Sequence, residues 1–86
     1  MILSFTQDGW EDYTYWQKTD RKTLQRINRL IADTMREPAG GIGKPEPLKW
    51  DLMGAWSKRI TDEHRMVYLP KAEELIVLSL RYHYDR

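Results

Sequence analysis

The sequence AWSKRITDEHRMVYL, residues 55–69, decides the fold. Two runs with aromatic and β-branched residues flank the short link Asp62-Glu63, a pattern that is typical of a β-hairpin. We therefore predict strands over 55–61 and 64–69. A further apolar run predicts a third strand over 75–84, so this part of the chain should form an antiparallel meander.

Two helices are predicted before the meander. The second has the clearer pattern, because apolar side chains recur at helical spacing. These side chains are Leu24, Ile27, Leu30, Ile31 and Met35. Asp20 is its expected N-cap and Pro38 its end. The earlier helix is expected to begin at the N-cap Asp8, with Glu11 reaching back to the cap. Its aromatic stripe consists of Trp10, Tyr13 and Trp16.

A short strand over 2–5 is expected before the helices, and a glycine-rich connector over 39–43 follows them. The segment 44–47 is stiffer, because each of its prolines fixes a backbone angle. The element order is thus β-α-α-β-β-β(-β). This order predicts an α+β fold with both N-terminal helices on one face of an antiparallel sheet. With 86 residues, we expect 1–86 to form one domain.

The composition excludes several classes of protein. Cysteine is absent and there are two histidines, so a disulfide scaffold and a structural zinc site are not expected. No nucleotide-binding glycine motif follows a predicted strand, and we expect no metal or cofactor. No apolar run approaches the roughly 20 residues of a membrane span. Residues 1–5 lack a basic leader, so we expect a cytoplasmic protein without a membrane partner.

Charge is unevenly distributed, although the net charge of +1 does not by itself indicate nucleic-acid binding. Residues 21–36 contain five Arg or Lys residues and one acid, Asp33. This basic stripe has two interpretations: a solvated helix face, or a patch that contacts RNA or the ribosome.

Alternation along the predicted strands places basic residues on one face of the sheet. These residues are Arg59, Arg65, Arg81 and His83. The core side of the strand over 75–84 is expected to consist of Ile76, Leu78, Leu80 and Tyr82, with Val77 and Ser79 on the basic side. Arginine matches phosphate oxygens and histidine transfers protons near neutral pH, so a phosphodiester site is one interpretation. The other interpretation is that the arginines are solvated, that His83 is incidental and that Glu46 is an exposed loop residue.

Several segments together resemble the YoeB/Txe toxins, which belong to the RelE-like group. The segments are Trp10-Glu11-Asp12-Tyr13 with Tyr15-Trp16-Gln17, Gly43-Lys44-Pro45-Glu46-Pro47-Leu48-Lys49, Trp56-Ser57-Lys58-Arg59-Ile60-Thr61, Glu63-His64-Arg65-Met66-Val67-Tyr68 and Arg81-Tyr82-His83-Tyr84. They occur in the family's order and spacing and span nearly the whole chain, so the set is specific although each string alone is weak.

The resemblance implies a RelE-like microbial ribonuclease fold and a toxin that a cognate antitoxin neutralises. It implies metal-independent cleavage of mRNA in the A site of the 70S ribosome, with the RNA 2′-OH as nucleophile. The implied catalytic residues are Glu46 as base, His83 as acid, Arg65 at the transition state and Tyr84 as the terminal aromatic. The implied substrate-binding residues are Lys44, Lys49, Arg59 and Arg81. A homodimer is compatible with the resemblance.

Some features depart from the family pattern. Trp50 stands where relatives often have a polar residue, and Asp85-Arg86 extend beyond Tyr84. The added carboxylates could raise the pKa of His83 or pair with Arg81. Tyr84 could stack on a base or orient the phosphate, and a Tyr84→Phe variant would distinguish these roles.

Three other functions remain open at this point. The chain could be a RelE-like toxin that cuts free RNA, a non-catalytic RNA- or ribosome-binding module, or a protein-interaction domain. The codon preference, the identity of the antitoxin and the oligomeric state do not follow from the sequence.

Overall fold

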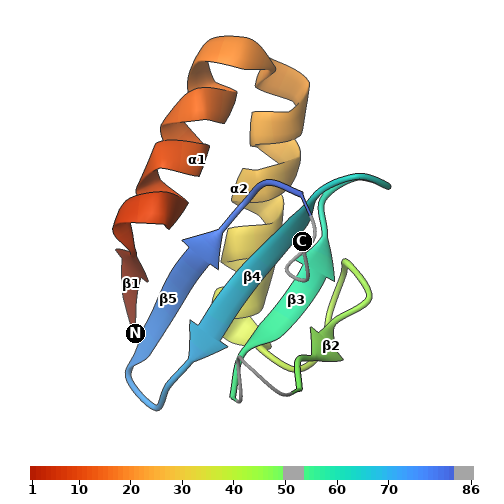
Figure 1. Ribbon diagram of the computed structural model, residues 1–86. Coiled ribbons are helices and arrows are strands. Elements are labelled where there is room, and N and C mark those ends of the chain that lie inside the picture. The colour runs from red at the N-terminus through yellow and green to blue at the C-terminus, as the bar shows by residue number, and fades with distance from the viewer. Residues whose placement is uncertain (50–53, 83–86) are drawn as a thin grey trace.

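A computed structural model describes residues 1–49 and 54–82 and has the element order β-α-α-β-β-β-β. A five-stranded sheet has the strand order β1-β5-β4-β3-β2 (Figure 1). The elements are β1 (Ile2–Phe5), α1 (Gln7–Thr19), α2 (Arg21–Arg36), β2 (Glu46–Pro47), β3 (Trp56–Arg59), β4 (Arg65–Pro70) and β5 (Glu74–Ser79). β1 pairs with β5 in parallel, and the other pairs are antiparallel. The predicted α+β class is thus confirmed, although one strand pair is parallel in a sheet that was expected to be antiparallel.

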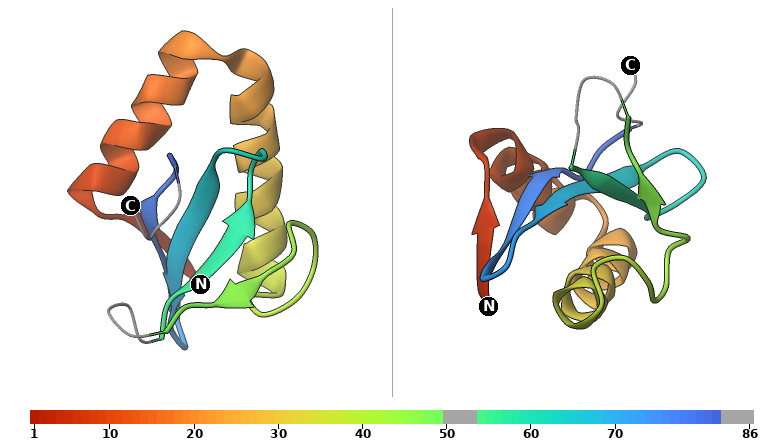
Figure 2. Two further views of the ribbon diagram at one scale, coloured as in Figure 1. Left: turned by 45° about the vertical axis from the view of Figure 1, so that its right-hand side comes forward. Right: turned by 90° about the horizontal axis from the view of Figure 1, so that it is seen from below.

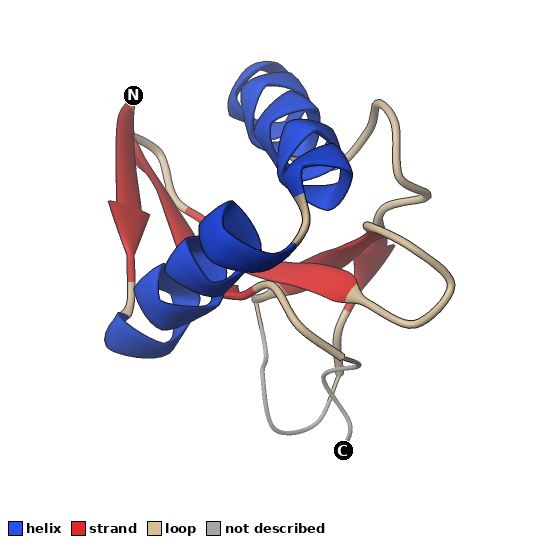
Figure 3. Cartoon of the chain, turned by 90° about the horizontal axis from the view of Figure 1, so that it is seen from above, coloured by secondary structure: helices blue, strands red, loops and turns tan. Residues whose placement is uncertain are grey.

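The two helices form a hairpin with a very short link (Figure 3). Asp20 provides the link and caps α2, since its carboxylate accepts the Thr23 N–H at 3.1 Å, as predicted. The predicted N-cap of α1 was wrong by two residues. Thr6, not Asp8, is the N-cap, because the Thr6 hydroxyl accepts the Gly9 N–H at 3.1 Å. That hydroxyl also donates to Leu78 O at 3.1 Å, so β5 fixes where α1 begins.

Both helices contribute to the main hydrophobic core. In the predicted stripe of α2, Ile27, Leu30 and Ile31 are buried there, and Leu24 and Met35 are partly buried against the same core. α1 adds Trp16. The sheet contributes Ile60, Met66, Tyr68, Leu75, Val77 and Leu80 to the same cluster. The helices therefore cover one face of the sheet, and Figure 2 shows α2 running along that side. Within residues 1–49 and 54–82, no helix has the length and hydrophobicity needed to cross a bilayer.

β1 has the predicted bounds and β4 is shifted by one residue, whereas β3 and β5 are shorter than predicted. β5 ends at Ser79 although the apolar pattern continues. The backbone of the next residue, Leu80, bonds to α1 instead of a neighbouring strand. Its N–H donates to Asp12 Oδ2 at 2.9 Å, and its carbonyl accepts from Trp16 Nε1 at 3.0 Å. Because α1 satisfies both polar groups of Leu80, the ladder stops there. Residues 83–84 of the predicted strand lie outside the described residues.

The predicted core side of β5 was wrong. Leu75 and Val77 are fully buried in the helix-side core, whereas Leu78 packs against a second cluster. That cluster consists of Leu48, Ala55 and Val67, with Leu69 beside it, on the face of the sheet away from the helices. Both faces of β5 are thus covered by apolar groups, so the alternation of residue types did not distinguish them. Leu80 is also buried in the helix-side core, beyond the end of the strand.

Candidate functional site

Strand pairing brings three of the candidate residues to one face of the sheet. Glu46 of β2 pairs with Ser57 of β3, and Ser57 pairs with Val67 of β4. Directly paired residues of antiparallel strands share a face, and Val67 belongs to the cluster away from the helices. Arg59 and Arg65 pair with each other two positions further along and therefore lie on the same face. The structure thus places a carboxylate and two guanidinium groups on one surface with an apolar floor.

The Arg65 side chain is held by the turn between β3 and β4. Its Nη1 donates to the carbonyl oxygens of Thr61 at 2.7 Å, Asp62 at 3.1 Å and His64 at 3.1 Å. These bonds use one of the two terminal nitrogens of the guanidinium. Because the turn fixes the side chain, the positive charge of Arg65 is oriented before any ligand arrives.

The same turn also holds the end of the described chain. The Thr61 hydroxyl accepts the N–H groups of Glu63 at 3.2 Å and His64 at 3.1 Å, which closes the turn. His64 Nδ1 accepts the Tyr82 N–H at 2.8 Å, and the Arg65 N–H donates to Tyr82 O at 3.1 Å. The predicted catalytic residues that follow Tyr82 in sequence, His83 and Tyr84, lie outside the described residues.

The loop that leads to Glu46 is fastened to α2 by Asp33. Asp33 Oδ2 accepts the Ile42 N–H at 2.9 Å and lies 3.4 Å from the Nζ of Lys58, which is fully buried. The hydrogen bond from Ile42 is the main reason that the pKa of Asp33 lies below its ordinary value. One residue further on, Gly43 O accepts the Arg59 N–H at 2.7 Å. The loop is thus attached to both α2 and β3 just before β2.

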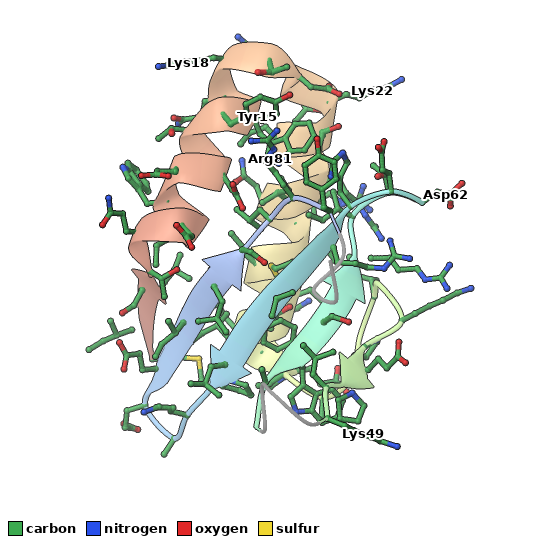
Figure 4. All side chains as sticks on the ribbon, viewed as in Figure 1. Tyr15, Lys18, Lys22, Lys49, Asp62 and Arg81 are labelled. Atoms are coloured by element: carbon green, nitrogen blue, oxygen red, sulfur yellow. The ribbon has the colours of Figure 1, made fainter. Side chains whose placement is uncertain are left out.

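Gly43 is required by this loop. Its φ is +90°, and a Cβ there would lie 2.8 Å from Leu30 Cδ2 and 3.0 Å from Lys58 Cβ. The next residue, Lys44, also has a positive φ of 52° and is exposed. The candidate substrate-binding residues Lys44 and Lys49 therefore flank Glu46 at the open edge of the sheet, where Figure 4 shows Lys49 pointing outward.

Arg81 does not continue the row of Arg59 and Arg65, contrary to the prediction from alternation. Its Cζ lies 3.8 Å from the centroid of the Tyr15 ring of α1, and Figure 4 shows the two side chains together. The strand ends two residues earlier, at Ser79, so alternation no longer sets the direction of this side chain. Arg81 instead makes a cation–π contact with a helix.

The basic stripe of α2 is largely exposed. Arg26 is the exception, since its Nη2 donates to Arg59 O at 3.1 Å and links α2 to the end of β3. Arg36 pairs with Asp33 at 3.2 Å on the same helix. Among the residues that the structure describes, no three His, Cys, Asp or Glu side chains are grouped closely enough to hold a metal ion.

Sequence reasoning assigned no individual role to Lys58 or His64. Lys58 lies between Ser57 and Arg59 on β3 and so faces the core, where a lysine needs an acidic partner. The position of Lys58 on the predicted strand therefore already indicated a buried ion pair. The bond from Tyr82 to His64 joins residues 18 positions apart, and no local pattern indicated it.

The family model for a YoeB-like toxin of bacterial type II toxin–antitoxin systems matches residues 5–84. Toxin YoeB of Streptomyces coelicolor is 57% identical over 84 residues, which cover 98% of this chain and 100% of that protein.

Solved structures agree with this similarity. The YoeB/ParE toxin from Agrobacterium tumefaciens has a TM-score of 0.93 and 48% identity, covering 98% of this chain and 100% of that one. YoeB from Staphylococcus aureus, solved as a dimer, has a TM-score of 0.91 and 41% identity, with 98% of each chain covered. In its heterotetrameric toxin–antitoxin complex with YefM, the TM-score is 0.89 at 41% identity, with 98% of each chain covered.

Proposed function

The chain belongs to the YoeB-like toxins of bacterial type II toxin–antitoxin systems, and on that basis we propose that it is an endoribonuclease that cuts mRNA in the ribosomal A site. The observation that carries the proposal is the shared sheet face of Glu46, Arg59 and Arg65. A carboxylate beside two guanidinium groups suits a reaction that removes a proton and develops negative charge on a phosphate.

In the proposed mechanism the substrate supplies its own nucleophile. Glu46 removes the proton of the 2′-OH, and the bond between O2′ and phosphorus forms while the bond between phosphorus and O5′ breaks. His83 donates a proton to the departing O5′, and Arg65 stabilises the charge on the phosphorane. The products are a 2′,3′-cyclic phosphate, or the 3′-phosphate after hydrolysis, and a 5′-hydroxyl. Such acid–base catalysis is typically worth about 10²–10⁴-fold in rate.

The structure supports these roles through preorganisation. Three carbonyl groups orient Arg65, and the loop before Glu46 is attached to α2 and β3, so little rearrangement is needed when RNA binds. Glu46 is exposed and therefore accessible to a substrate. Lys44, Lys49, Arg59 and Arg81 would contact the RNA backbone, and Tyr84 would stack on a base or orient the scissile phosphate.

A cognate antitoxin is the proposed protein partner, since a Staphylococcus aureus relative was solved with YefM. We expect a neutralising segment to cover the basic face of the sheet. The relative that was solved as a dimer supports the same assembly for this chain. The other proposed partners are the ribosome and mRNA. Because both are found in the cytoplasm, we expect the protein to act there.

The test is a purified translation system with a defined mRNA and mapped cut ends. Wild type, Glu46→Ala and His83→Gln are compared, with Glu73→Ala as the control for removing an exposed carboxylate elsewhere. Cuts within the A-site codon that depend on ribosomes, persist in Glu73→Ala and disappear in the other two variants would support the proposal. Cuts without ribosomes would indicate a free-RNA nuclease, and no cuts by folded wild type would indicate a binding module. A 5′-phosphate product would exclude the mechanism.

A further inference from the structure

We propose that His64 is a positioning residue that fixes the backbone of Tyr82, the residue before His83 in the sequence, by accepting a hydrogen bond from the Tyr82 N–H. The inference rests on the proposed function, in which His83 is the general acid. Nothing in that reaction requires a second histidine. His64 is nevertheless placed so that its ring nitrogen controls the residue next to His83 in the chain.

The geometry around Tyr82 supports this role. Its N–H donates to His64 Nδ1 at 2.8 Å, and its carbonyl accepts from the Arg65 N–H at 3.1 Å. Tyr82 has a φ of +59°, a left-handed conformation that residues other than glycine seldom adopt. His64 and Arg65, which are consecutive in the sequence, thus bind both backbone polar groups of Tyr82, and these bonds favour a backbone conformation that would otherwise be uncommon.

The ring of His64 is itself held firmly. Its centroid lies 4.9 Å from the Trp16 ring at an interplanar angle of 80°, and 5.0 Å from the Tyr82 ring. The His64 side chain is only 14% exposed. In this proposal His64 acts through the backbone of Tyr82.

Only one protonation state of His64 can make this bond. A nitrogen that accepts a hydrogen bond must have a free lone pair, so Nδ1 is unprotonated and Nε2 bears the hydrogen. Nε2 lies 3.8 Å from Glu63 Oε1. When the ring gains a second proton, Nδ1 becomes a donor that faces the Tyr82 N–H, and the contact becomes repulsive.

The charged groups around the ring oppose one another. Glu63 and Asp12 favour the protonated form, whereas Arg81 and Arg65 disfavour it. Burial of the ring is the largest influence, and it lowers the pKa of His64 below 6.5. The bond is therefore intact at neutral pH and is lost as the pH falls through this lowered value.

The first test measures the bond without reference to activity. In ¹⁵N NMR of the full chain, we expect His64 to be the neutral Nε2–H tautomer and the Tyr82 amide to shift in step with the His64 ring on acidification. His64→Asn should keep the Tyr82 amide in place at all pH values, because the amide oxygen of asparagine occupies the position of Nδ1 and does not titrate. An Nδ1–H tautomer, or a Tyr82 amide that ignores the His64 titration, would overturn the proposal.

The second test measures the single-turnover cleavage rate as a function of pH. His64→Leu should lower the rate by roughly 10²-fold at neutral pH, as expected for misplacement of a catalytic group. His64→Asn should retain most of the rate at neutral pH. In the pH–rate profile of this variant, the fall in rate at acidic pH that is caused by protonation of His64 should be absent. Circular dichroism would establish that both variants fold.

The outcomes separate the two proposals. If wild type cuts no RNA, the proposed function fails, while the NMR experiment still decides whether His64 holds Tyr82. If wild type is active and folded His64→Leu has the wild-type rate, the positioning role is wrong. A His64→Asn profile identical in shape to that of wild type would also contradict it.

Discussion

Replacing Trp16 with Phe should destabilise the fold strongly, because the indole joins α1 to the point where β5 ends. Trp16 is 5% exposed and its Nε1 donates to Leu80 O at 3.0 Å. Leaving a buried acceptor without this bond costs about 1–3 kcal/mol. The smaller ring also removes roughly two methylene equivalents of buried surface, at about 0.8 kcal/mol each. The expected loss in unfolding free energy is thus about 3–4 kcal/mol.

The measurement is urea unfolding followed by circular dichroism at neutral pH. Trp10→Phe is the matched control, because it makes the same chemical change where the ring is 51% exposed. We expect that control to lose less than about 1 kcal/mol. In thermal unfolding, the loss for Trp16→Phe corresponds to a fall in Tm of roughly 12–30 °C. If the two variants had equal unfolding free energies, the contact between the indole and Leu80 would not stabilise the protein as reasoned.

Three further predictions concern a helix cap, a glycine and pH. Thr6→Ala should lower the unfolding free energy by about 1 kcal/mol through loss of the N-cap, whereas Asp8→Ala should have a smaller effect in the same urea titration. Gly43→Ala should cost more than about 1 kcal/mol, because it combines a positive φ with close contacts. Gly40→Ala is its control, since a Cβ there would meet only the flexible Glu37 side chain, and equal stabilities would contradict the strain. The stabilisation from neutral His64 should be complete above pH 6.5 and lost as the pH falls through the lowered pKa. In His64→Asn, the unfolding free energy should depend less on pH in this range. An unchanged slope would mean that another titrating group causes the dependence.

Local patterns predicted the elements that depend on local physics. The helical spacing of apolar residues and the Asp20 cap identified α2, and the short acidic link identified the hairpin of β3 and β4. The cap of α1 was misassigned because Thr6 is chosen by its contact with Leu78 O as well as by the helix. A tertiary contact of this kind leaves no trace in the neighbouring sequence.

The candidate site was predictable in part for the same reason. Alternation correctly placed Arg59 and Arg65 on one face, because both lie within or at the end of regular strands. Alternation failed for Arg81, which lies two residues beyond the end of β5 and stacks on the Tyr15 ring. Glu46 joins the site through β2, a strand of two residues that is too short to have a recognisable period.

The parallel pairing of β1 with β5 has a consequence for how the protein is made. Ile2 aligns with Glu74 and Phe5 aligns with Val77, so the paired strands lie far apart in the sequence. Contacts between such distant residues form late, because the intervening chain must first be ordered. During translation the helical hairpin can form early, but the sheet cannot be completed until β5 has left the ribosome. A nascent chain therefore has an incomplete sheet until the β5 segment is free to pair with β1, and a working toxin cannot appear before that pairing.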